Sequence, residues 1–223
     1  MTLPSLPCAV VFDMDGLMLD SERVERWAWR SACAARGYDF DDPFHRTLVG
    51  RRDADVRRDL SARFGASFPL DEVQAEAHVL WLGRVREQGM PPKPGLAELL
   101  QVIEELGLPK AVATSSIRSR VELSLGALAA RFDAIVTGDE VRAGKPDPEI
   151  YLTAADRIGV PPGACLALED SAAGLLAAER AGMVAVLIPD LVEPTVAPRL
   201  RASSLLEVRD WLLDAVRAAG RRP

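Results

Sequence analysis

The chain has 223 residues, of which 48% are hydrophobic, and a formal net charge of −6. This length and apolar content exclude a disordered chain and can form one sizeable core, with room for a small second unit. The acidic balance argues against a nucleic-acid partner, because a phosphate backbone requires a basic face, and no apolar run approaches the ~20 residues that a membrane span needs.

The first expected element is a buried strand at 9–12, where four apolar residues precede a turn. A long helical region without strand patterns follows, with its clearest helices at 21–36 and 71–87. It returns through 89–95, a stiff linker rich in proline and glycine. Two linkers that join two units are typical of a cap that can hinge. We therefore expect a helical cap domain at 19–92, inserted into a core domain made of 1–18 and 93–223.

From residue 95 onward, helical patterns alternate with short apolar runs. The expected helices span 95–106, 116–128, 148–158 and 172–181, with a last helix between Ser204 and Gly220. The apolar runs at 110–113, 134–136, 165–168 and 184–188 are expected to be buried parallel strands. This alternation predicts an α/β fold, a doubly wound parallel sheet with right-handed crossovers.

Polar residues suited to phosphate chemistry follow four of these strands. They are Asp13 and Asp15, then Thr114, Ser115 and Ser116, then Lys145, and finally Glu169 and Asp170. In an open α/β sheet, ligands bind beyond the carboxyl ends of the strands, so these groups are expected to meet there. A solvated turn would also explain Asp13 and Asp15 alone, but the recurrence at four strand ends favours a site.

This set of side chains suits phosphoryl transfer. A carboxylate nucleophile can form an aspartyl-phosphate, and a second carboxyl group can protonate the leaving oxygen and then activate water. The hydroxyls of Thr114 and Ser115 and the ammonium of Lys145 can bind the phosphoryl oxygens. Acids tolerate a phosphate dianion only beside a hard cation, and Mg²⁺ prefers oxygen ligands, which Asp13 and Asp170 can supply.

In this order and at these strand ends, the motifs resemble those of the haloacid dehalogenase superfamily. They are Asp13-Met14-Asp15-Gly16, Thr114, Lys145-Pro146 and Glu169-Asp170. The resemblance extends from residue 8 to about 189 and is strongest to β-phosphoglucomutases and sugar-phosphate phosphatases, which carry a helical cap.

The resemblance implies a role for each matching residue. Asp13 would be the nucleophile and Asp15 the acid/base, while Thr114 and Lys145 would bind the transferring phosphoryl group. Magnesium would be held by Asp13, the backbone carbonyl of Asp15 and Asp170, with Glu169 in direct or outer contact.

Three departures from related activities narrow the reaction. Dehalogenases of the superfamily lack an acid two residues after the nucleophile, and Asp15 is present. Mutases use a cap histidine and a cap lysine, whereas this chain has Glu25 at the place of the histidine and no lysine between Ser21 and Pro92. The missing lysine also argues against a phosphonate hydrolase. We therefore expect hydrolysis of a small phosphomonoester such as a sugar or polyol phosphate, with a phosphosugar mutase and an inactive binding protein on the same scaffold as alternatives.

Substrate choice is expected to lie in the cap. Gly50-Arg51-Arg52 resembles the cap loop that faces the active site in sugar-phosphate phosphatases, so Arg52 is a candidate substrate-binding residue, together with Glu25. The alternative is that Arg52 belongs to a solvated helical face with neighbouring arginines.

The expected partner is therefore a small phosphorylated metabolite, with no nucleic acid and no membrane. Cys8, Cys33 and Cys165 show no zinc-ligand spacing and are expected to be small buried residues in a reducing compartment. Because no signal peptide opens the sequence, we expect a cytoplasmic protein, and a monomer is the default.

Overall fold

The computed structural model describes residues 3–48 and 53–220. The chain divides into two compact units. We call Met1–Leu19 with Pro91–Pro223 the core unit, and Asp20–Met90 the helical unit. The expected boundaries, after residues 18 and 92, differ from these by one and two residues.

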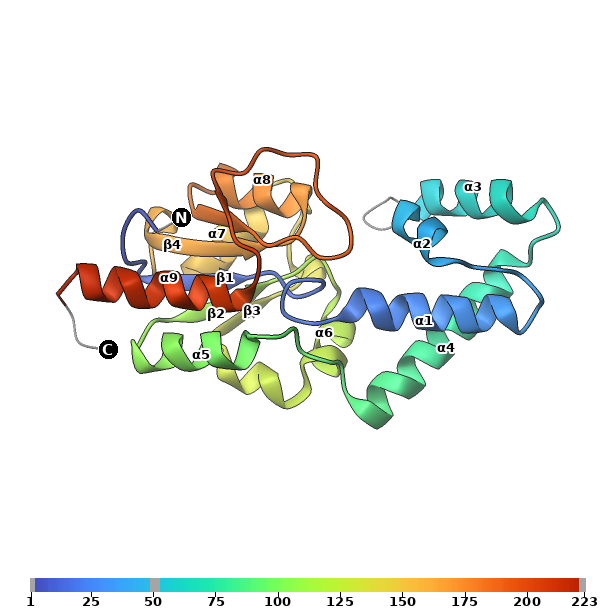
Figure 1. Cartoon of the computed structure of the whole chain (residues 1–223), viewed down its shortest axis with the longest axis horizontal. Coiled ribbons are helices and arrows are strands. Elements are labelled where there is room, and N and C mark those ends of the chain that lie inside the picture. The colour runs from blue at the N-terminus through green and yellow to red at the C-terminus, as the bar shows by residue number, and fades with distance from the viewer. Residues whose placement is uncertain (1–2, 49–52, 221–223) are drawn as a thin grey trace. The chain divides into compact units, whose positions relative to one another are not determined.

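The core unit is built on a six-stranded parallel sheet in the order β3-β2-β1-β4-β5-β6 (Figure 1). The strands are β1 (Ala9–Phe12), β2 (Lys110–Ala113), β3 (Ala134–Val136), β4 (Cys165–Glu169), β5 (Val184–Leu187) and β6 (Leu200–Arg201). Strand β1 lies inside the sheet, where Val11 pairs with Ala111 of β2 and with Ala167 of β4. The chain reverses its direction of winding between β1 and β4, which makes that point the crevice in which such folds bind ligands.

Helices cover both faces of the sheet. They are α5 (Leu96–Glu105), α6 (Arg118–Leu125), α7 (Glu149–Arg157), α8 (Ala172–Arg180) and α9 (Leu205–Ala218), with short 3₁₀ helices η1 (Gly126–Arg131), η2 (Gly138–Glu140) and η3 (Pro162–Ala164). Alternate strand residues such as Val11 and Ala167 pack against α7 and α8 in one buried cluster. Helices α5 and α9 pack together and cover the other face (Figure 1).

The predicted α/β fold is confirmed, and its differences from the structure are local. The expected helix at 116–128 is shorter, because Gly126 ends α6 with a φ of 48° and the chain continues as η1. Strand β6 is not among the expected strands, because two residues carry no periodicity. Cys33 and Cys165 are buried as expected, but Cys8 is exposed, so that prediction was wrong for one of the three.

The helical unit contains α1 (Ser21–Ala34), α2 (Asp42–Leu48), α3 (Asp53–Phe64) and α4 (Leu70–Gln88). Its described residues contain no strand, and α1 packs along α4. Aromatic rings pack together in this unit, where the half-buried Phe64 and Tyr38 both lie close to the buried Phe68, at centroid distances of 4.8 and 4.9 Å. Within the described parts of both units, no helix is long and apolar enough to cross a bilayer.

Candidate active site

The first acidic group lies where β1 ends. Asp13 follows the strand directly, and its backbone N–H donates to Leu168 O at 3.0 Å, which ties the end of β1 to β4. Gly16 then turns the chain with a φ of 81°, in the left-handed region that favours glycine. The Asp13 side chain is therefore held, almost fully buried, at the carboxyl edge of the sheet.

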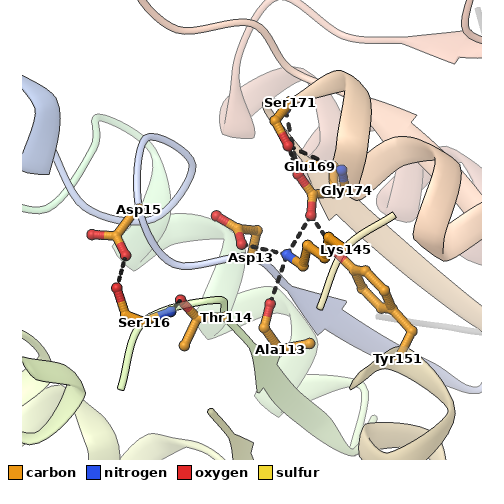
Figure 2. Close-up of polar contacts among 10 residues, drawn as sticks. All are labelled: Asp13, Asp15, Ala113, Thr114, Ser116, Lys145, Tyr151, Glu169, Ser171 and Gly174. Carbon is orange, nitrogen blue, oxygen red and sulfur yellow. Dashed lines mark hydrogen bonds and ion pairs between the residues drawn. The ribbon is translucent and has the colours of Figure 1, made fainter. Parts of the chain in front are cut away.

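Lys145 is the cation at the centre of this edge. Its ammonium donates to Asp13 Oδ1 at 2.6 Å, to Glu169 Oε1 at 2.6 Å and to Ala113 O at 3.0 Å, as Figure 2 shows. Burial alone would lower the pKa of Lys145, but the carboxylates of Asp13 and Glu169 raise it above its usual value. The side chain is therefore a fixed positive charge beside Asp13.

Glu169 ends β4 as a fully buried carboxylate. Its Oε1 accepts from Lys145 and also from the Tyr151 hydroxyl, at 2.5 Å. Its Oε2 accepts from the hydroxyl and the backbone N–H of Ser171, at 3.1 and 3.3 Å. Gly174 leaves room for it, because an ideal Cβ there would lie 1.8 Å from Glu169 Oε1.

Asp15 is oriented by the segment that follows β2. Ser116 Oγ donates to Asp15 Oδ2 at 2.7 Å, and the Ser116 backbone N–H donates to Thr114 Oγ1 at 3.1 Å (Figure 2). The other carboxylate oxygen, Asp15 Oδ1, is buried and has no hydrogen-bond partner among the described residues. That oxygen is therefore available to a substrate atom.

Three carboxylates at this edge have a geometry that fits a divalent cation. Ligand oxygens of Asp13, Glu169 and Asp170 lie within 4.8 Å of one another, with Lys145 as the cation bonded to two of them. Burial raises the pKa of Asp13 and that of Asp170, and the neighbouring carboxylates raise both further. A bound Mg²⁺ would offset this excess of negative charge with the oxygen ligands that it prefers.

The structure brings most of the predicted site residues together at one edge of the sheet. These are Asp13, Asp15, Thr114, Lys145, Glu169 and Asp170. Ser115 is exposed, and its backbone carbonyl lies against Gly138, where an ideal Cβ would come within 2.2 Å of it. Glu25 is half-buried on α1 of the helical unit, and Arg52 lies outside the described residues, so both stay predictions.

Tyr151 is a site residue that sequence reasoning did not single out. It lies on α7, inside an ordinary amphipathic pattern, and only the fold places it against Glu169. Asp190 is a second example. It forms an ion pair with Lys93. The pKa of Asp170 is raised mainly by burial and by the charges of Asp13 and Glu169, and the charge of Asp190 adds a smaller increase. No local spacing relates either residue to the motifs.

Comparison with known families gives a match over most of the chain. Residues 9–182 match the haloacid dehalogenase-like hydrolase family. This range contains all of the strand-end residues described above.

Individual relatives are similar over most of their length. The validoxylamine A 7′-phosphate phosphatase of Streptomyces hygroscopicus subsp. limoneus is 35% identical over 184 residues, which are 79% of this chain and 83% of the relative. The phosphorylated carbohydrates phosphatase of Thermotoga maritima is 32% identical, over 78% of this chain and 82% of the relative. A crystal structure of a HAD family hydrolase from Deinococcus radiodurans with bound phosphate and sodium superimposes with a TM-score of 0.79 at 27% identity, covering 95% and 97% of the two chains.

Proposed function

The chain belongs to the haloacid dehalogenase-like hydrolase family, and we propose that it is a Mg²⁺-dependent phosphatase that acts through an aspartyl-phosphate on Asp13. The observation that carries this proposal is the position of Lys145, whose ammonium lies 2.6 Å from Asp13 Oδ1. As Asp13 attacks the phosphorus, the N–H that Lys145 gives to Asp13 Oδ1 can turn to a phosphoryl oxygen. Relatives that are named phosphatases support phosphomonoester hydrolysis.

The proposed reaction has two steps, and Asp15 transfers one proton in each. In the first, a carboxylate oxygen of Asp13 bonds to phosphorus, the bond from phosphorus to the leaving oxygen breaks, and Asp15 gives its proton to that oxygen. In the second, Asp15 takes a proton from a water molecule as the water oxygen bonds to phosphorus and the acyl phosphate bond breaks. The Oδ1 of Asp15, which has no hydrogen-bond partner in the part of the chain that the structure describes, suits both transfers.

The donors around Asp13 stabilise the charge on the transferring group. Lys145 and the Thr114 hydroxyl are the candidates for its oxygens. Asp13, Asp170 and the backbone carbonyl of Asp15 would hold Mg²⁺, with Glu169 adding its charge. When bound, that ion would reduce the repulsion between the acids and the phosphate dianion.

The substrate that we propose is a small sugar or polyol phosphate, in keeping with the carbohydrate phosphatase relatives. The helical unit is proposed to act as the cap, with Glu25 and Arg52 as the candidate selectivity residues. A single polypeptide chain is sufficient for this chemistry, because every proposed catalytic group comes from one core unit.

The decisive experiment is phosphate release from p-nitrophenyl phosphate and a panel of sugar phosphates, with Mg²⁺ or with EDTA. We expect release with Mg²⁺ only, and a loss of at least about a thousand-fold in kcat in Asp13→Asn, which keeps the shape of the side chain and removes the nucleophile. The matched control is Asp156→Asn, an exposed acid on α7, which is expected to retain full activity. Full activity in purified Asp13→Asn, or no release from any ester with Mg²⁺, would refute the proposal.

A further inference from the structure

Tyr151 contacts two residues of the site, Glu169 and Lys145. It is fully buried on α7, and its hydroxyl donates to Glu169 Oε1 at 2.5 Å. The ammonium of Lys145 lies over the face of its ring, with Nζ 5.0 Å from the ring centroid. Figure 2 shows the two side chains as neighbours. A cation in that position is attracted by the ring as well as by the carboxylates.

All three N–H donors of the Lys145 ammonium are engaged. Its ammonium has three N–H groups, and the structure gives it three acceptors, Asp13 Oδ1, Glu169 Oε1 and Ala113 O. The direction in which it points at Asp13 therefore depends on where the Glu169 carboxylate lies.

The Glu169 carboxylate depends in turn on its donors, because it is fully buried and cannot be solvated. Ser171 holds Oε2, while Tyr151 and Lys145 share Oε1. Without the tyrosine hydroxyl, Lys145 would be the only side chain among the described residues that donates to Oε1, and the carboxylate could rotate about its last bond to follow it.

We propose that Tyr151 is a positioning residue for phosphoryl transfer. Its hydroxyl fixes Glu169, and its ring and Glu169 together fix the Lys145 ammonium beside Asp13. The inference rests on the proposed phosphatase function. The role is one of geometry, since a small displacement of a catalytic group lowers the rate more than it lowers binding.

Tyr151→Phe tests this, because it keeps the ring and removes only the hydroxyl. With p-nitrophenyl phosphate and Mg²⁺, we expect kcat to fall about tenfold or more while KM changes less than about twofold. The matched control is Ile150→Val, which loses one buried methylene from the neighbouring residue of the same cluster and is expected to keep kcat within about twofold. Each protein is assayed at a temperature at which circular dichroism shows it to be fully folded.

Each result of this experiment either supports or overturns the role of Tyr151. A folded Tyr151→Phe protein with the kcat of the wild type would overturn the inference, and so would an equal fall of kcat in Ile150→Val, which would indicate a general packing effect. A Tyr151→Phe protein that does not fold even at 10 °C would assign the hydroxyl to the fold instead. Failure of the proposed phosphatase function can be told apart from failure of the Tyr151 inference, because in that case the wild type would be as inactive as Asp13→Asn.

Discussion

At the scale of single residues, two glycines make room for the acids of the site. An ideal Cβ on Gly16 would lie 2.1 Å from Asp170 Oδ2, and one on Gly174 would lie 1.8 Å from Glu169 Oε1. Gly16 also needs its positive φ, whereas Gly174 has ordinary helical geometry within α8. At Gly174 the missing side chain therefore serves the site alone, and helix propensity would favour alanine there.

We predict that Gly174→Ala lowers both stability and activity. The added methyl group must displace a buried carboxylate that four hydrogen bonds hold, so we expect a loss of about 1–3 kcal/mol in the free energy of unfolding and at least a tenfold fall in kcat. Urea denaturation and p-nitrophenyl phosphate turnover measure the two effects.

Gly83→Ala is the control for this substitution. Gly83 is also helical, on α4, but nothing lies within 4 Å of its ideal Cβ. Alanine there is expected to raise the free energy of unfolding by about 0.5–1 kcal/mol. Equal effects of the two substitutions would show that the packing of Glu169 against Gly174 has no consequence.

At the scale of elements, helix α2 carries a buried histidine. His45 is 5% exposed, its Nδ1 is buried without a hydrogen-bond partner among the described residues, and its ring lies 6.0 Å from that of Phe40. The pKa of His45 is lowered to about 4, mainly by burial and then by the charge of Arg26, while the charge of Asp42 opposes the shift. The imidazole is therefore neutral in the folded helical unit at neutral pH.

This shift predicts a loss of stability as the pH falls below the ordinary histidine pKa of about 6.5. Between about pH 6.5 and about 4, the unfolded chain binds a proton at His45 that the folded chain does not. The stability that depends on a neutral His45 is therefore fully present above about pH 6.5 and is lost as the pH falls. The slope is at most about 1.4 kcal/mol per pH unit. Urea denaturation of the wild type and of His45→Gln at pH 7, 6 and 5 measures it. The variant is expected to show the shallower decline, and parallel declines would contradict the assignment.

At the scale of the whole molecule, the chain leaves and re-enters the core unit at neighbouring points. Leu19 and Pro92 form an antiparallel bridge, and the Lys93 backbone N–H donates to Met18 O at 2.8 Å. Within residues 3–48 and 53–220, the buried cluster between the sheet and helices α7 and α8 contains no residue of the helical unit. The core unit therefore has an interior of its own and a ready point of closure.

We predict that the core unit folds without residues 20–90 when Leu19 is joined to Pro91 through two glycines. Leu19 and Pro92 already form an antiparallel bridge, which the two glycines and Pro91 would close as a three-residue loop, so little strain is expected. Circular dichroism should show a cooperative thermal transition. If the helical unit is the cap, the shortened protein should lose selectivity, so its kcat/KM values for different sugar phosphates should become more similar to one another. Full-length Asp13→Asn is the control for folding without turnover, and a shortened chain that shows no cooperative transition would contradict the prediction.

Local patterns of apolar and polar residues were sufficient to predict the fold class and the strands that carry the motifs. Runs such as 9–12 and 165–168 are short, apolar and bounded by polar residues, so the local pattern sufficed to place them at β1 and β4. Because parallel strands end at one edge of their sheet, the groups after those strands could also be expected to meet, and Lys145 does lie against Asp13 across 132 residues of chain.

The neighbours that hold those groups could not be predicted and are known from the folded chain. It made Ser116 the residue that contacts Asp15, placed Tyr151 beneath Lys145, paired β6 with β5 and left Cys8 exposed. None of these has a local signature, because each depends on contacts between segments whose spacing along the chain carries no information about their distance. Hydrogen-bond partners are chosen by packing at the scale of an ångström, whereas apolar periodicity specifies only which face of an element is buried.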